Sequence, residues 1–254
     1  MHTVTGGTGT TLLYQTDSYR STFEATVVAQ VADERAVVLD QTAFYATGGG
    51  QPHDTGTLTQ GEWSAAVQDV RKSDAGILHV LDTDDLPAIG STVTGIVDWE
   101  RRHALMRMHS ALHVLCGTVY RDYGAKVTGG NMEPDHARMD FEMDSSEFTP
   151  ERVAEIASRA NAEIAAERDI RVQILPRDEA FQIPDLIRTR INLLPEGISE
   201  VRTVEIVGLD LQADGGTHVH NTREIGTLQV TGTRSKGKIN KRIEIALDPP
   251  PTRA

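Results

Sequence analysis

The sequence predicts an α+β protein in which a small N-terminal β-barrel domain precedes an α+β domain with helices packed on an antiparallel sheet. Between residues 11 and 93, short apolar-rich runs are separated by turn residues, and no helical periodicity occurs. From residue 98 onward, helical and strand-like segments occur in runs rather than in strict alternation, which is typical of the α+β class. With 254 residues, the chain is long enough for two domains, expected at 1–94 and 95–254.

The first domain is expected to be all-β and closed, because many short, evenly spaced strands favour a barrel over an open sheet. The strand-like runs are TFEATVVAQV (22–31), RAVVLDQTAFYA (35–46), TGTLTQGEWSAAVQDV (55–70) and GILHVLDT (76–83). Among them lies the glycine-rich run Gly48, Gly49, Gly50 and Gln51. Successive glycines indicate a backbone with positive φ or a close approach by another group, so a hairpin turn and a binding loop both stay open.

The second domain is expected to begin with a helix from about Asp98 to Gly124, since Leu105, Met108 and Leu112 recur at helical spacing. A short β region follows in MEPDHARMDFEMD (132–144). Thr149 and Pro150 then provide a cap and a first-turn proline for a second helix, which runs to about residue 168. The remaining segments are expected as strands: RVQILPR (171–177), RTVEIVGLDLQ (202–212) and the hairpin GTLQVTGTRSKGKINKRIEIALD (226–248).

The composition is that of an ordinary globular protein, with 39% hydrophobic and 24% charged residues. No stretch of eighteen apolar residues occurs and no signal peptide is evident, so we expect a cytoplasmic protein with no membrane partner. The single cysteine, Cys116, lies in an apolar run and is expected to be a buried small hydrophobe rather than a nucleophile.

The net charge of −12 argues against non-specific coating of nucleic acid, because phosphate contacts need lysine and arginine. One segment near the C-terminus is nevertheless positively charged. Its positive residues are Arg234, Lys236, Lys238, Lys241 and Arg242. Spacing alone does not decide between a solvated basic hairpin and a phosphate-binding surface for RNA.

Two short segments carry candidate metal ligands. His109 and His113 are four residues apart on the first predicted helix, so both imidazoles lie on one helical face. About a hundred residues later, Asp214 and His218 flank two glycines. Three imidazoles and a carboxylate suit zinc better than other divalent metals. His220 is a rival ligand, but we prefer His218 because it lies at the same turn as Asp214.

The chemistry of such a site depends on its coordination. A zinc ion with one open position can polarise a carbonyl or lower the pKa of a bound water, and so cleave esters and amides. Four protein ligands would instead close the coordination shell, and the ion would then be structural or would exchange a ligand to bind substrate. The sequence does not decide between these alternatives.

These motifs resemble the editing region of alanyl-tRNA synthetases and the free-standing AlaX-type trans-editing proteins. HSALH at 109–113 is similar to the HxxxH motif of the family, and GGTHVHNTREIG at 215–226 to its second half-site. FYATGGGQPHDTG (44–56) and SKGKINKRIEIAL (235–247) resemble the glycine-rich motif and the basic closing hairpin. The resemblance extends from about residue 11 to 247.

The resemblance implies a zinc-dependent deacylase that hydrolyses Ser-tRNA(Ala), with Gly-tRNA(Ala) as a second candidate, and that binds the acceptor end of tRNA(Ala). It implies that His109, His113 and His218 are zinc ligands. Substrate contacts would come from Gly48, Gly49, Gly50, Gln51 and Thr217, and RNA contacts from Lys236, Lys238, Lys241 and Arg242.

Asp214 departs from the family pattern, because alanyl-tRNA synthetases typically have cysteine at that position. Asp214 can be the fourth ligand, a group behind the ligands, or a base that activates water. Two other function classes stay open: a metal hydrolase of a small ester or amide, and a tRNA-binding module with structural zinc.

Overall fold

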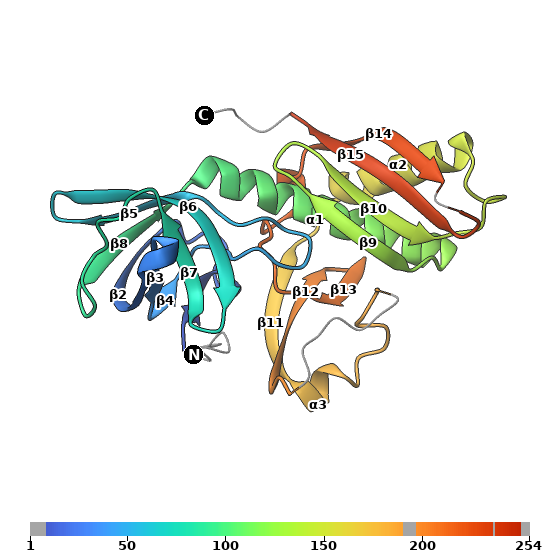
Figure 1. Ribbon diagram of the computed structural model, residues 1–254. Coiled ribbons are helices and arrows are strands. Elements are labelled where there is room, and N and C mark those ends of the chain that lie inside the picture. Colours follow the sequence, from blue (N-terminus) through green and yellow to red (C-terminus); the bar gives the residue numbers. More distant parts are fainter. Residues whose placement is uncertain (1–8, 190–196, 236, 250–254) are drawn as a thin grey trace. The chain divides into compact units, whose positions relative to one another are not determined.

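The computed structural model describes residues 9–189, 197–235 and 237–249, and the chain divides into two compact units, Met1–His103 and Ala104–Ala254. The predicted fold class is confirmed, because a closed antiparallel barrel lies near the N-terminus and the rest combines helices with antiparallel sheets (Figure 1). The expected boundary between residues 94 and 95 lies within strand β8 (Thr92–Val97). The division between the two compact units falls inside helix α1 (Trp99–Tyr123).

The barrel of the first unit closes in the order β2-β3-β7-β6-β5-β8. Inward-facing residues of β2, such as Phe23, Ala25 and Val27, are buried in its core. Position 95 must lack a side chain, because a Cβ on Gly95 would lie 2.4 Å from the ring of Phe23. Besides β8, the barrel strands are β2 (Thr22–Val31), β3 (Ala36–Leu39), β5 (Gly56–Gln60), β6 (Trp63–Ser73) and β7 (Gly76–Leu81). Two short strands of this unit, β1 (Thr11–Leu12) and β4 (Gln41–Thr42), pair in parallel.

A buried ion pair connects the first residues of α1 to the loops of this unit. The Arg102 guanidinium contacts the carboxylate of Asp54, and both side chains are fully buried. Arg102 also donates to the carbonyl oxygens of Ser18, at 2.8 Å, and Ala43, at 2.5 Å. Because each of these acceptors comes from a different loop, one side chain joins three loops to the first turn of the helix.

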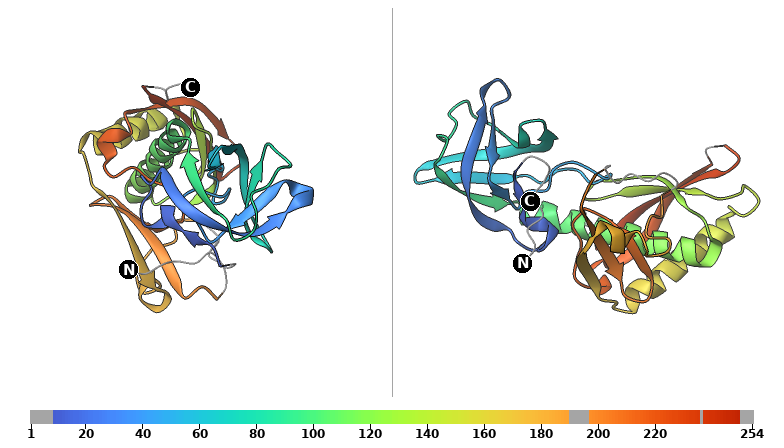
Figure 2. Two further views of the ribbon diagram at one scale, coloured as in Figure 1. Left: turned by 90° about the vertical axis from the view of Figure 1, so that its left-hand side faces the viewer. Right: turned by 90° about the horizontal axis from the view of Figure 1, so that it is seen from below.

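The main sheet of the second unit has the order β14-β15-β10-β9. Its strands are β9 (Val127–Met132), β10 (Ala137–Glu142), β14 (Thr227–Ser235) and β15 (Asn240–Asp248). Helices α1 and α2 (Pro150–Ala165) lie on one face of this sheet (Figures 1 and 2). Thr149 caps α2 by accepting from the backbone N–H of Arg152, and α1 ends before Gly124, which has φ +67°. The sequence predicted both of these end signals.

A second sheet of three strands contains β11 (Ile170–Pro176), β12 (Glu200–Ile206) and β13 (Asp210–Ala213). The expectation of one strand over residues 202–212 was wrong. Gly208 has φ +77°, which lets the chain reverse between β12 and β13. This reversal positions the end of β13 and the residues that follow it. The short helices are η1 (Leu13–Gln15), η2 (Ala32–Glu34), α3 (Arg177–Ala180) and η3 (Thr222–Glu224).

None of the helices within the described ranges combines the length and the apolar character that a membrane-spanning helix requires.

Candidate metal centre

Helix α1 contributes two histidines from its buried middle part. Residues 104–119 are all buried, so the polar side chains of α1 are enclosed as completely as its leucines. His109 and His113 are each 6% exposed. Buried polar groups require partners, and for these two histidines the partners come from the chain after β12.

The segment after β13 contributes the other two side chains. Oδ2 of Asp214 accepts from the backbone N–H of Gly216 at 2.7 Å, and this bond closes the turn that leads to His218. Gly215 and Gly216 do not have positive φ angles. The turn is therefore stabilised by the Asp214 carboxylate and does not need a backbone conformation that only glycine allows. His218 is 2% exposed.

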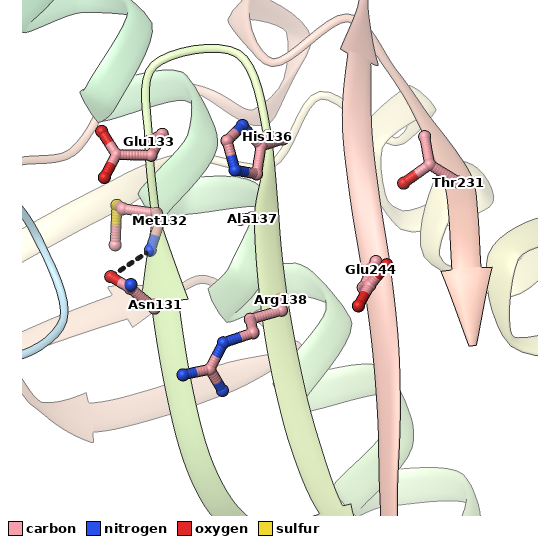
Figure 3. A pocket seen from close by; sticks show the side chains of 8 residues that line it. All are labelled: Asn131, Met132, Glu133, His136, Ala137, Arg138, Thr231 and Glu244. Atoms are coloured by element: carbon pink, nitrogen blue, oxygen red, sulfur yellow. Dashed lines mark hydrogen bonds between the residues drawn. The ribbon is translucent and has the colours of Figure 1, made fainter. Parts of the chain in front are cut away.

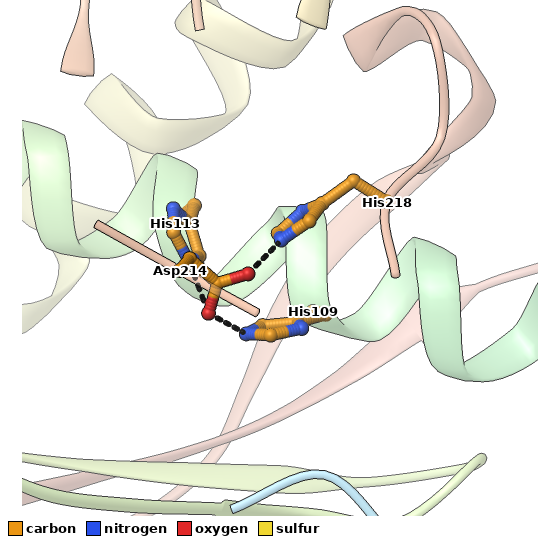
Figure 4. A group of neighbouring side chains, drawn as sticks. All are labelled: His109, His113, Asp214 and His218. Carbon is orange, nitrogen blue, oxygen red and sulfur yellow. Dashed lines mark hydrogen bonds and ion pairs between the residues drawn. The ribbon is translucent and has the colours of Figure 1, made fainter. Parts of the chain in front are cut away.

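The four side chains meet at one point (Figure 4). Their candidate ligand atoms all lie within 4.8 Å of one another. Asp214 is central: its Oδ1 lies 3.6 Å from Nε2 of His109 and 3.9 Å from Nε2 of His113. Its Oδ2 lies 3.0 Å from Nε2 of His218. The structure therefore brings together all four residues that the sequence proposed as ligands.

The electrostatics of the cluster favour neutral imidazoles at His109 and His218 and an ionised carboxylate at Asp214. Burial lowers the pKa of His109 well below its usual value and lowers the pKa of His218 to about 4. Burial opposes ionisation of Asp214, but His109 and His218 outweigh it and hold the pKa of that carboxyl well below its usual value.

His113 differs from the other two histidines. Burial lowers its pKa, but the carboxylates of Asp210 and Asp214 outweigh burial, and the net effect raises the pKa. These two carboxylates thus favour the protonated, positively charged form of His113.

The donor set fits a zinc ion. Tetrahedral zinc with bonds of about 2.0–2.2 Å separates neighbouring donor atoms by about 3.3–3.6 Å. The three separations between Asp214 oxygens and histidine Nε2 atoms are 3.6, 3.9 and 3.0 Å. The ligand atoms of the cluster lie within 4.8 Å of one another, so some of them would have to move closer by up to about 1.5 Å to reach the tetrahedral values. The cluster can therefore hold a metal ion, and its nitrogen and oxygen donors suit zinc.

Sequence reasoning missed three buried side chains around this cluster. Nδ1 of His218 lies 3.1 Å from Oγ of Ser110, and Nδ1 of His113 lies 3.7 Å from Oδ2 of Asp210. Nη1 of Arg202 donates to the carbonyl oxygen of Asp214 at 2.9 Å and lies 3.6 Å from its Oδ2. Ser110 lies inside the HSALH motif, and Asp210 precedes Asp214 by four residues, on the same side of an extended chain.

His220, the rival ligand, and His103, on the same helix as His109, lie outside the cluster. His220 is exposed and is not a member of the cluster, whereas His218 is. His103 stacks on Trp99 with ring centroids 5.5 Å apart. Cys116 is buried, and burial raises the pKa of its thiol, so it is a protonated core residue rather than a nucleophile.

The glycine-rich run forms a two-residue hairpin turn. Gly48 and Gln51 exchange both backbone hydrogen bonds, at 3.1 and 3.0 Å. Gly49 and Gly50 have φ +60° and +86°, which is the type I′ geometry that glycine permits. Gln51 in the first unit and Thr217 in the second are both buried. A role in substrate binding for this loop and for Thr217 stays a prediction.

The basic hairpin β14–β15 divides its positive residues into exposed and internal ones. Lys238 is exposed. Lys241 is 1% exposed, and its Nζ donates to Oγ of Ser145 and Ser235 and to the carbonyl oxygens of Gly237 and Lys238. This position does not fit direct contact between Lys241 and RNA.

Arg242 is also internal. It is 9% exposed, and its Nε and Nη2 pair with the carboxylate of Asp140 at 2.7 and 2.9 Å. Lys236, the remaining residue of the RNA-binding prediction, lies outside the described residues.

A separate hollow of about 290 Å³ lies between β9, β10 and the neighbouring strands (Figure 3). Arg138, Glu133 and Glu244 bring charges of both signs to its lining. None of its lining residues belongs to the histidine cluster. Its volume is at the lower end of the range for ligand sites.

Comparison with known proteins identifies the family. Residues 13–101 match the model of class II (A) tRNA synthetases, and residues 201–244 match the second additional domain of threonyl and alanyl tRNA synthetases. The chain is 37% identical over 239 residues to the alanyl-tRNA editing protein AlaX-M of Saccharolobus solfataricus, covering 93% of this chain and 98% of that protein. The chain belongs to the AlaX-M family of alanyl-tRNA editing proteins.

Further relatives define how much of the family this chain contains. The AlaX-M protein of Methanosarcina barkeri is 38% identical over 243 residues, which cover 94% of this chain and 99% of that protein. The alanine–tRNA ligase of Pyrobaculum calidifontis is 40% identical over 223 residues, which cover 86% of this chain but 24% of the ligase. The chain thus matches AlaX-M proteins over nearly their whole length and the ligase over one part.

Proposed function

We propose that the protein is a trans-editing deacylase that hydrolyses Ser-tRNA(Ala), with Gly-tRNA(Ala) as the second candidate substrate, at a zinc site. The observation that carries this proposal is the convergence of His109, His113, His218 and Asp214 within 4.8 Å in a member of an alanyl-tRNA editing family. An enzyme that removes an amino acid from tRNA breaks a carboxylic ester, and a metal site of this composition suits that reaction.

The side chains of the cluster have distinct roles in this proposal. When bound, zinc polarises an ester carbonyl and lowers the pKa of water. His109 and His218 offer neutral ring nitrogens, because burial lowers their pKa. Asp214 is ionised and contributes an oxygen donor. Arg202, 3.6 Å from Oδ2 of Asp214, offsets the negative charge of that carboxylate.

The tRNA would be held by the basic hairpin. Lys238 is exposed and available to a phosphate, whereas Lys241 and Arg242 stabilise the hairpin from inside. By resemblance to the family, Thr217 and the Gly48–Gln51 turn would take part in recognising the aminoacyl group. Lys238→Ala should raise the KM for Ser-tRNA(Ala) more than it changes kcat, which distinguishes a tRNA substrate from a small ester.

Release of serine from Ser-tRNA(Ala) tests the proposal. We expect His109→Ala and His218→Ala to lower the rate by about a hundredfold or more, because each removes one ligand. His220→Ala is the matched control: it removes an exposed imidazole two residues from His218 and should retain the rate of the unmodified protein. Unchanged turnover in both cluster variants would contradict the proposal.

A further inference from the structure

We propose that Ser110 is a positioning residue, which orients the ring of His218 so that its Nε2 atom faces the metal site. This inference rests on the proposed function, because it assigns a role toward the proposed zinc ion. Ser110 lies on α1 between His109 and His113 and is fully buried. It is therefore shielded from water, and its hydroxyl must be satisfied by protein groups.

Two groups from the segment after β13 converge on the Ser110 hydroxyl. Nδ1 of His218 lies 3.1 Å from Oγ, and the backbone N–H of Val219 donates to Oγ at 3.2 Å. The serine thus contacts the ring of the ligand and the backbone of the next residue. These two contacts fix both the position of the chain at His218 and the rotation of its imidazole.

The Ser110 hydroxyl can form a hydrogen bond with either tautomer of the His218 ring. With the proton on Nδ1, the ring donates to Oγ, and the lone pair on Nε2 is free for a metal ion. With the proton on Nε2, the ring donates to Oδ2 of Asp214 at 3.0 Å, and the serine O–H donates to Nδ1. A hydroxyl both donates and accepts, so Ser110 can hold the ring in one place whether or not zinc is bound.

His113 has a carboxylate, rather than a hydroxyl, near its Nδ1 atom. Oδ2 of Asp210 faces Nδ1 of His113 at 3.7 Å, and Asp210 is held in turn by Nε of Arg188 at 3.3 Å and Nε2 of Gln212 at 2.5 Å. One ligand therefore has a carboxylate behind it and another has a hydroxyl. Groups that accept the second ring N–H of a ligating histidine fix its orientation, and their loss weakens metal binding.

The test measures zinc affinity by competition with a chromophoric chelator, in the full-length protein. We expect Ser110→Ala to bind zinc about 10–100-fold more weakly, and Ser110→Thr, which keeps the hydroxyl, to recover most of that loss. Thr118→Val is the matched control. Thr118 is fully buried on the same helix, and its hydroxyl has no hydrogen-bond partner in the part of the chain that the structure describes. That variant should bind zinc like the unmodified protein.

A second readout does not depend on activity. In the zinc-loaded protein, we expect the ring N–H of His218 to exchange slowly with solvent by nuclear magnetic resonance, and to exchange fast in Ser110→Ala. Equal zinc affinity in Ser110→Ala and the unmodified protein would overturn the role proposed for Ser110 and would leave the proposed function standing. Failure of the unmodified protein to release serine from Ser-tRNA(Ala) would instead overturn the proposed function. If Ser110→Ala does not fold, Ser110→Thr with weakened zinc binding and no slow N–H would also overturn the inference.

Discussion

Asp214 is the residue on which the character of the metal site depends most. It faces all three histidines and also binds the backbone of Gly216, so one carboxylate organises both the donor set and the turn. An oxygen donor is harder than the thiolate expected there from the resemblance to alanyl-tRNA synthetases, and harder donors select less strongly for zinc.

We predict that Asp214→Cys binds zinc more tightly than the unmodified protein and that Asp214→Ala binds it at least tenfold more weakly. The physical reason is that cysteine replaces one anionic ligand with a softer one, whereas alanine removes the ligand. Competitive zinc titration of both variants measures this. Zinc affinity that does not change in Asp214→Ala would show that Asp214 is not a ligand and would favour its role as a base.

His79 gives the barrel a defined pH dependence. It is fully buried in β7, its Nε2 lies 2.8 Å from Oγ1 of Thr42, and burial lowers its pKa to about 4 from 6.5. The unfolded chain therefore binds a proton between pH 6.5 and 4 that the folded barrel does not. Stability from this group is fully present above pH 6.5 and is lost as the pH falls toward 4, by about 3 kcal/mol.

Urea unfolding at several pH values checks this prediction. Both tryptophans, Trp63 and Trp99, lie in the first unit, so their fluorescence reports on its unfolding. We expect the loss of unfolding free energy between pH 6.5 and 4 to be smaller by about 3 kcal/mol in His79→Gln, because glutamine does not titrate. An equally steep pH dependence in both proteins would contradict this account of His79.

Among the structural elements, the β14–β15 hairpin depends on a buried ammonium. Nζ of Lys241 has four oxygen acceptors, two hydroxyls and two carbonyls, which lie in the loop after β10, at the end of β14 and in the hairpin turn. We predict that Lys241→Met lowers the unfolding free energy by about 1–3 kcal/mol, because it leaves these acceptors without their donor. Hydrogen exchange should also become faster in residues 237–241.

Lys238→Met provides the control for this element. Lys238 is on the same hairpin and is exposed, so its loss should leave the unfolding free energy within about 0.5 kcal/mol of the original. Equal destabilisation by the two variants would show that charge on the hairpin matters rather than the internal contacts of Lys241.

The ends of the helices could be predicted from sequence, because local signals determine them. Thr149 and Pro150 mark the start of α2, and Gly124 marks the end of α1. The turn at Gly208 was missed, since the apolar pattern continues through it. Lys241 was assigned to the surface, although it alternates with Ile243 and Ile245 and so shares their buried face.

The metal cluster could be proposed because its members lie in two short segments with regular spacing. The sequence did not predict the contacts that three further residues make with this cluster, because each contact depends on which distant residue the fold places nearby. These residues are Ser110, Asp210 and Arg202. The positions of these charged groups and of this hydroxyl relative to the cluster are determined by the tertiary structure. A pattern within one segment predicts which side chains share a face but not what faces them.

The molecule as a whole combines a β-barrel unit with a unit that contains the histidine–aspartate cluster, and it belongs to a family of alanyl-tRNA editing proteins. The net charge of −12 places any tRNA contact on local surfaces such as the one around Lys238, rather than on the overall electrostatic field. The match to nearly the full length of AlaX-M proteins shows that these relatives share both units of the chain.

The most direct test is the release of serine from Ser-tRNA(Ala) by the purified protein, measured before metal removal, after removal by a chelator, and after zinc is added back. We expect removal to abolish release while circular dichroism shows the fold retained, and zinc to restore it, because a catalytic ion can leave a folded site. Full release by the metal-free protein would contradict the account.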